Sequence, residues 1–223
     1  LLVLQAMGIS AFGLNCTSAD LCPDTISEIA PYAKIPLIVK PSAVYEQDGE
    51  RQSISPEEFA FAVKKSVLSG AEIAGGCCGT GKEHIAALRE MFASLDASEI
   101  NPVEKQDTSL ALATENQMFF LDPETTEFSP AVECGPYMED DIAQMCGESY
   151  DVLTVSINSP DDAIDFGRNM HMATLPVAFL SDDEISLKMA LMLYQGRAII
   201  DRKSLIEPEK LEAMAEKYGA VLY

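Results

Sequence analysis

Short apolar runs alternate with helix-type patterns along the chain, and this alternation predicts an α/β fold. In the first part, residues 9–15, 35–40 and 71–74 are apolar runs typical of buried strands. Residues 1–7 resemble the end of a helix, and a further helix is expected from 82 to 92. Strands that alternate with helices in this way favour parallel βαβ units.

Helix-start signals support this assignment. Ser55 is followed by Pro56 and, three residues on, by Glu58, which is the pattern of a capping box. Asp24 or Thr25 is expected to cap the preceding helix. The polar stretch 46–53 is predicted as a loop.

The remainder of the chain shows a second α/β pattern. We expect a hairpin from 110–114 and 118–121, followed by strands at 152–157, 175–180, 198–200 and 220–222. Helices are predicted from Ser159, from Ser181 with Glu184 as its capping partner, and from Glu207. A polar connector over 94–108 predicts two domains, 1–104 and 105–223.

Charge and composition exclude several classes of function. The chain has 223 residues with 36 acidic and 15 basic side chains, giving a formal charge of −21. The negative electrostatic potential of a chain with this charge disfavours nucleic acid and anionic membrane surfaces as partners. No apolar run reaches the roughly 20 residues that span a bilayer. The more acidic second part is interpreted as a solvated face.

The cysteines carry the clearest chemical signal. Cys77 and Cys78 are adjacent in Gly-Gly-Cys-Cys-Gly-Thr at 75–80, directly after a predicted strand. Neighbouring side chains of a regular strand point to opposite faces, so both thiols reach one ion only where glycines such as Gly75 and Gly76 let the backbone turn. Cys16 ends an earlier strand, and the carboxyl ends of parallel strands gather on one face. We therefore predict a soft metal ion such as Zn²⁺ on Cys16, Cys77 and Cys78.

Other interpretations of these residues stay open. The cysteines can be small buried hydrophobic residues, and Cys22 is a possible fourth ligand that would make a closed structural site. The adjacent pair and the absence of a visible export signal favour thiols or metal over disulfides, and hence a reducing, cytoplasmic location. Cys134 and Cys146 have no second metal-ligating residue at a spacing typical of a metal site, and both are interpreted as inert. His84 and His171 are interpreted as structural residues near helix ends.

The two motifs Gly13-Leu14-Asn15-Cys16 and 75–80, with Glu83-His84-Ile85 after them, resemble the homocysteine S-methyltransferase family. The resemblance covers residues 1 to about 95. It implies the C-terminal portion of a (β/α)₈ TIM-type barrel, here followed by a smaller α/β domain. It also implies that Cys16, Cys77 and Cys78 are zinc ligands and that the homocysteine thiol enters the coordination sphere. The family's Pro-Asn after the seventh strand is Pro41-Ser42 here.

The resulting hypothesis is zinc-dependent transfer of a methyl group from a small donor, for example methylfolate or methylcobalamin, to homocysteine, giving methionine. Three β/α units do not close an eight-stranded barrel, so the chain is expected to be part of a longer enzyme. Residues 175–223 weakly resemble part of a pterin-binding barrel, and 105–223 is interpreted as an accessory domain that caps the first part or contacts a partner. The alternatives are a non-catalytic zinc-stabilised or partner-binding α/β protein, and an α/β interaction domain without metal.

Overall fold

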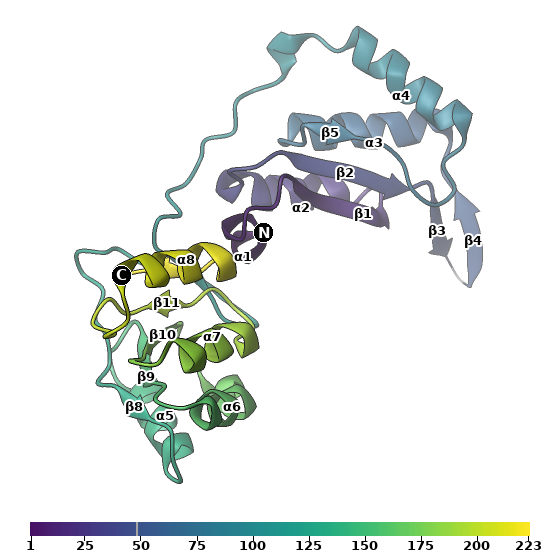
Figure 1. Ribbon diagram of the computed structural model, residues 1–223. Helices are drawn as coiled ribbons and strands as arrows, with labels where there is room; N and C mark the ends of the chain where they lie inside the picture. Colours follow the sequence, from purple (N-terminus) through teal and green to yellow (C-terminus); the bar gives the residue numbers. More distant parts are fainter. Residues whose placement is uncertain (48) are drawn as a thin grey trace. The chain divides into compact units, whose positions relative to one another are not determined.

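The computed structural model describes residues 1–47 and 49–223, which form two compact units (Figure 1). Unit 1 comprises residue 1 and residues 9–106, and unit 2 comprises residues 2–8 and 107–223. In the described residues, no helix combines the length and the apolar character needed to cross a membrane.

The strands are β1 (Phe12–Ser18), β2 (Leu37–Ser42), β3 (Val44–Gln47), β4 (Glu50–Ser53), β5 (Ile73–Ala74), β6 (Ala111–Ala113), β7 (Met118–Phe120), β8 (Val132–Glu133), β9 (Leu153–Ser156), β10 (Val177–Leu180), β11 (Ile199–Ile200) and β12 (Val221–Leu222). The α-helices are α1 (Leu2–Ala6), α2 (Cys22–Ile29), α3 (Pro56–Leu68), α4 (Lys82–Ser94), α5 (Met138–Gly147), α6 (Pro160–Asn169), α7 (Glu184–Leu193) and α8 (Pro208–Tyr218). Short 3₁₀ helices are η1 (Ala30–Tyr32), η2 (Ala97–Glu99) and η3 (Met170–Met172).

A parallel sheet organises the described part of unit 1. Its strand order is β1-β2-β5, so that order in space follows order in sequence. Leu37 and Val39 of β2 are buried in one core with Phe59 and Val63 of α3. The alternate residue Lys40 is exposed on the other side of the strand. The predicted α/β class with parallel strands is confirmed, and its carboxyl-terminal strand ends lie together.

Local signals in unit 1 are partly confirmed. The Ser55 hydroxyl accepts from the Glu58 N–H, and the Glu58 carboxylate accepts from the Ser55 N–H, so the predicted capping box starts α3. The cap predicted at Asp24 or Thr25 is wrong. Helix α2 begins at Cys22 without a side-chain cap, and the Thr25 hydroxyl instead donates to the Leu21 carbonyl.

The polar stretch 46–53 is not a simple loop, although its residue 48 lies outside the described residues. The stretch contributes to the antiparallel hairpin β3–β4, in which Val44 pairs with Ser53 and Tyr45 with Gln52. Its sequence lacks apolar alternation, which is the signal that marks a half-buried strand. The missed hairpin is therefore a polar one that follows the end of β2.

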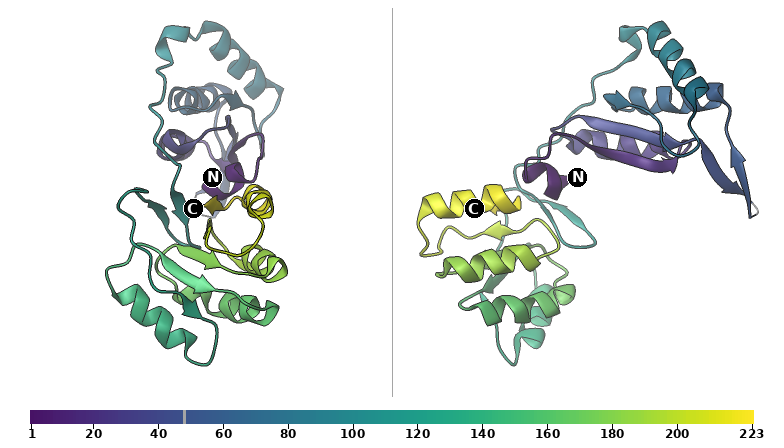
Figure 2. Two further views of the ribbon diagram at one scale, coloured as in Figure 1. Left: turned by 60° about the vertical axis from the view of Figure 1, so that its left-hand side comes forward. Right: turned by 45° about the vertical axis from the view of Figure 1, so that its right-hand side comes forward.

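Unit 2 contains, within the described chain, a parallel sheet of order β12-β11-β10-β9-β8 (Figures 1 and 2). One face is packed by apolar residues of the helices, including Phe166 of α6 and Leu187 of α7. The other face packs against the β6–β7 hairpin through Leu112. The Arg197 guanidinium ties the layers together by donating to the carbonyls of Ala111 and Gly219.

The unit 2 elements follow the predicted pattern with two corrections. The hairpin around residues 115–116 is confirmed as β6–β7, whereas β8 and α5 were not predicted. Helix α7 is capped by Asp183, whose carboxylate accepts from the Ser186 N–H, and not by Ser181. Ser181 is buried and donates to the Ile157 carbonyl, which removes it from the capping position.

Candidate metal centre

Three sulfur atoms meet at the carboxyl ends of β1 and β5. The Sγ atoms of Cys16, Cys77 and Cys78 all lie within 4.8 Å of one another, and among the described residues they form the one cluster of metal-binding side chains. Cys78 Sγ is 3.4 Å from Cys16 Sγ and 4.0 Å from Cys77 Sγ. Cys16 and Cys78 are exposed and Cys77 is half-buried, so a ligand can reach the cluster from solvent.

Backbone geometry at Cys16 allows its thiol to join the pair. Its φ is 58°, and in the described chain it is the one non-glycine residue with a positive φ. The register between β1 and β2 shifts over the same residues, between Asn15 and Ser18. The left-handed conformation breaks the alternation of side chains along β1. Such an uncommon conformation is typical of functional sites.

The glycines around the pair shape a tight turn. Gly79 has a φ of 77°, and a Cβ there would lie 2.4 Å from Val44 Cγ1. A Cβ on Gly76 would lie 2.6 Å from the Thr80 side chain, whose hydroxyl donates to the Cys77 carbonyl over 2.6 Å. Residues 76 and 79 therefore have no space for a side chain larger than the hydrogen atom of glycine.

Main-chain links fix this turn on the end of β2. The Cys77 N–H donates to the Pro41 carbonyl over 3.0 Å, and the Ala43 N–H donates to the Cys78 carbonyl over 2.8 Å. The Ser42 hydroxyl also lies 3.2 Å from that carbonyl. Since the same hydroxyl lies 2.8 Å from the Val44 carbonyl, Ser42 contacts both the thiol turn and the start of β3, a role that no sequence signal indicated.

Three thiol donors suit a tetrahedral thiolate-bound ion such as Zn²⁺, and two of their three separations are close to those in such a site. With Zn–S bonds of about 2.3 Å, two sulfur ligands of a tetrahedral ion lie about 3.8 Å apart. The two separations that involve Cys78, 3.4 and 4.0 Å, lie on either side of this value. Three sulfur donors leave the fourth position of such an ion for a further ligand.

Cys16 and Cys77 are joined by a disulfide in this structure, whereas the sequence favoured thiols or metal ligands over disulfides. Their Cα atoms are 5.5 Å apart, a separation that suits a disulfide as well as ligation of a shared ion. Holding a metal on all three sulfurs requires this pair in its reduced form.

Cys22 does not belong to the cluster. Its buried thiol lies at the start of α2, 3.4 Å from the Ser18 carbonyl to which it donates. Burial, with a smaller contribution from Asp20, raises the pKa of this thiol to about 11. A neutral, buried thiol is a poor metal ligand, so the possible fourth protein ligand is not supported.

His84 is held in a structural role at the start of α4. Its Nδ1 accepts from the Gly81 N–H over 3.2 Å, and its Nε2 lies 3.2 Å from the Ile54 carbonyl. Its ring also packs edge-on against Phe59. Both ring nitrogens therefore have partners in the protein.

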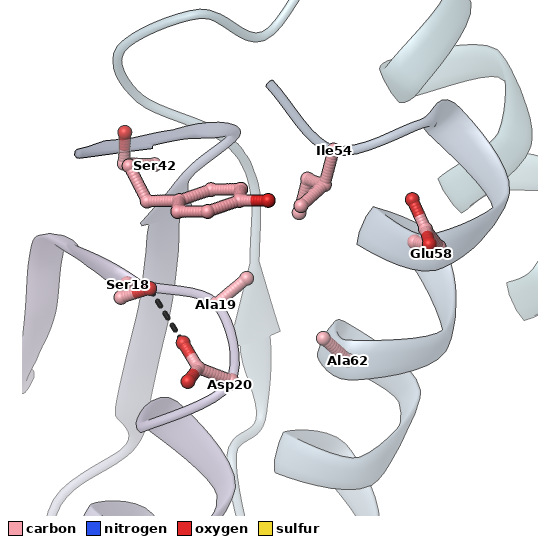
Figure 3. A pocket seen from close by; sticks show the side chains of 8 residues that line it. Ser18, Ala19, Asp20, Ser42, Ile54, Glu58 and Ala62 are labelled. Atoms are coloured by element: carbon pink, nitrogen blue, oxygen red, sulfur yellow. Dashed lines mark hydrogen bonds between the residues drawn. The ribbon is translucent and has the colours of Figure 1, made fainter. Parts of the chain in front are cut away.

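A cavity of about 270 Å³ opens beside the ends of β1 and β2 (Figure 3). Ser18, Asp20 and Ser42 line it from the strand ends, and Glu58 lines it from α3. The Ser18 hydroxyl donates to the Asp20 carboxylate, drawn as the dashed line in Figure 3. The lining carries two carboxylates, so this cavity is unsuited to an anion.

Comparison with known proteins bears on the same part of the chain. Residues 1–92 match the family model of homocysteine S-methyltransferase. A methionine synthase of Mycobacterium leprae is 32% identical over 100 residues, which cover 43% of this chain and 8% of that protein. A homocysteine S-methyltransferase of Bacillus subtilis is 30% identical over 91 residues, covering 39% of this chain and 29% of the relative. A selenocysteine methyltransferase of Astragalus bisulcatus is 27% identical over 92 residues, covering 39% and 27% respectively.

The chain therefore spans less than a third of the length of these curated relatives. The matched segment ends within α4, so it contains all three cysteines of the cluster. The resemblance drawn from the two motifs is confirmed for this segment.

Proposed function

Given that residues 1–92 match the homocysteine S-methyltransferase family, we propose that this chain carries the zinc-binding part of an enzyme that methylates the thiol of homocysteine. The observation that carries the proposal is the meeting of Cys16, Cys77 and Cys78 at the strand ends. Within this proposal, residues 1–104 are the carboxyl-terminal β/α units of a (β/α)₈ barrel. Residues 105–223 are an accessory acidic domain.

The chain contributes the ligands and the surface that orients the substrate sulfur. When bound to three thiolates, Zn²⁺ supplies Lewis acidity that keeps a coordinated thiol deprotonated at neutral pH. A free thiol, with a pKa near 8.5, is mostly protonated there. In the transfer, a bond forms between the homocysteine sulfur and the methyl carbon while the bond from that carbon to the donor breaks, with its electron pair leaving on the donor.

Ligand number favours this function over a structural zinc site. A closed site needs four protein ligands, and the candidate for the fourth, Cys22, is buried and hydrogen-bonded elsewhere. Exposure of Cys16 and Cys78 supports access by a substrate. The ligand thiols must be reduced, and we therefore place the enzyme in a reducing, cytoplasmic compartment.

Metal analysis of the reduced chain tests the proposal. We expect about one zinc per chain in the wild type, and loss of that zinc in Cys16→Ser, Cys77→Ala and Cys78→Ser. Cys146→Ser is the matched control, because Cys146 is a free, half-buried cysteine outside the cluster; it should retain the metal. Zinc content unchanged by Cys77→Ala would contradict the proposal.

The fourth position has its own test. Cobalt(II) in place of zinc gives sulfur-to-metal absorption that responds to the number of thiolates. Addition of homocysteine should increase this absorption in the wild type, since a thiol enters the open position. A spectrum that already shows four thiolates and ignores homocysteine would support a structural site instead.

A further inference from the structure

Lys40 occupies a position between the two thiol-bearing segments. Strand register pairs it with Asn15, the residue before Cys16. On its other side, the Gly75 N–H donates to the Val39 carbonyl and the Cys77 N–H donates to the Pro41 carbonyl. Lys40 thus lies on the middle strand, about 4.8 Å from the backbone of each neighbour.

The side chain of Lys40 runs toward the thiol turn. A Cβ placed on Gly75 would lie 3.4 Å from Lys40 Cγ and 3.6 Å from Lys40 Cδ, so the lysine stem covers the backbone at residue 75. Gly75 lies two residues before Cys77, so the lysine stem lies against the segment that leads to the thiol turn.

The charge of Lys40 is not neutralised by a neighbouring acid. Lys64 pairs with Glu99 and Lys82 lies near Glu83, whereas no described carboxylate forms an ion pair with Lys40. An exposed ammonium on the strand between the two thiol-bearing segments is a position at which an anion is stabilised. The overall charge of −21 would otherwise disfavour the carboxylate group of a substrate.

We propose that Lys40 binds the α-carboxylate of the amino-acid thiol whose sulfur occupies the open metal position. This proposal rests on the proposed function and adds how the substrate is selected. In homocysteine a short flexible chain separates the sulfur from the carboxylate, which suits a metal ligand at one end and an ammonium at the other. A lysine binds as a point charge with three donors, so it tolerates small shifts of the carboxylate.

The selectivity follows from this arrangement. A thiol that carries a carboxylate gains a charge-assisted hydrogen bond that a neutral thiol cannot form. Removing such a bond weakens binding about tenfold or more. The binding affinity of thiols without a carboxylate does not depend on this hydrogen bond.

Thiol titrations of the reduced, cobalt-loaded full chain test the proposal. The probes are homocysteine, 3-mercaptopropionate and the neutral 2-mercaptoethanol, and the readout is the sulfur-to-cobalt absorption. In Lys40→Met the two carboxylate thiols should bind about tenfold or more weakly, while binding of 2-mercaptoethanol stays within about twofold. Lys40→Arg should restore most of the affinity, because the positive charge is retained.

The control and the contrary outcomes separate this proposal from the proposed function. Lys82→Met removes an equal charge from an exposed residue near the same turn, and it should leave all three titrations unchanged. Equal weakening of charged and neutral thiols in Lys40→Met would overturn the carboxylate assignment, and so would no weakening at all. A wild-type chain that takes up no cobalt would overturn the proposed function and this proposal together.

Discussion

Replacement of Gly79 by alanine should loosen the thiol turn and weaken metal binding. The φ of 77° costs a non-glycine residue about 1–2 kcal/mol. The new Cβ would also lie 2.4 Å from Val44 Cγ1, and overpacking of this kind costs about 1–3 kcal/mol. We therefore expect Gly79→Ala to lower the free energy of unfolding by about 2–5 kcal/mol.

A matched glycine separates the two contributions. Gly49 has a φ of 78°, and a Cβ added there would meet nothing within 4 Å, so Gly49→Ala should cost only the conformational part, about 1–2 kcal/mol. Combining Gly79→Ala with Val44→Ala removes the contacting methyl group. The double variant should then be more stable than the sum of the single effects by about 1–3 kcal/mol.

Urea unfolding of the reduced chain, followed by circular dichroism, measures these free energies, and competition with a zinc-binding dye measures the metal affinity. Gly79→Ala should lose zinc affinity, because residue 79 directly follows the Cys77–Cys78 pair. The reasoning is refuted if Gly79→Ala and Gly49→Ala destabilise the chain equally within about 0.5 kcal/mol. It is also refuted if Val44→Ala gives no recovery.

Three further predictions concern other parts of the chain. Gly13→Ala would place a Cβ 1.8 Å from the Ile38 carbonyl oxygen, so β1 should separate from β2 with a loss above about 3 kcal/mol in urea unfolding. Cys22, with its pKa raised to about 11, should resist alkylation at pH 9, whereas the exposed thiol of Cys78 should react. The contribution of the neutral Cys22 thiol to the free energy of unfolding is complete below pH 9 and is lost as pH rises through 11. Arg197→Met should destabilise unit 2 by about 2–4 kcal/mol, because the backbone carbonyls that it serves lose their donor; denaturation curves that match the wild type would contradict this.

The fold was predictable where local chemistry and periodicity agree. The capping box of Ser55 and Glu58 lies within four residues, so its geometry follows from sequence alone. The start of α7 was misplaced because Ser181 and Asp183 both suit a cap, and tertiary contacts decide between them. The polar hairpin β3–β4 escaped prediction because it lacks the apolar alternation of a half-buried strand.

The sequence predicts which cysteines meet in the candidate site, but it does not predict the backbone conformation that brings them together. Cysteines at the ends of parallel strands meet because those ends lie on one face of the sheet. The positive φ of Cys16 has no sequence signal, since non-glycine residues rarely adopt it. Nor did the sequence mark Lys40 or Ser42, whose importance depends on the register that places them beside the thiol turn.

The structure shows that Cys22 does not join the three sulfur atoms of the cluster, which the sequence alone left open. Cys22 lies six residues from Cys16 in sequence, close enough to have served as a fourth ligand. The start of α2 buries its thiol and gives it the Ser18 carbonyl as an acceptor, so recruiting it would require that helix end to unfold. A metal held by the three sulfurs, as we propose, would keep its exposed side free, and a thiol from solvent could complete it without unfolding that helix end. In our proposal, the buried orientation of the Cys22 side chain therefore decides between a structural and a substrate-binding metal.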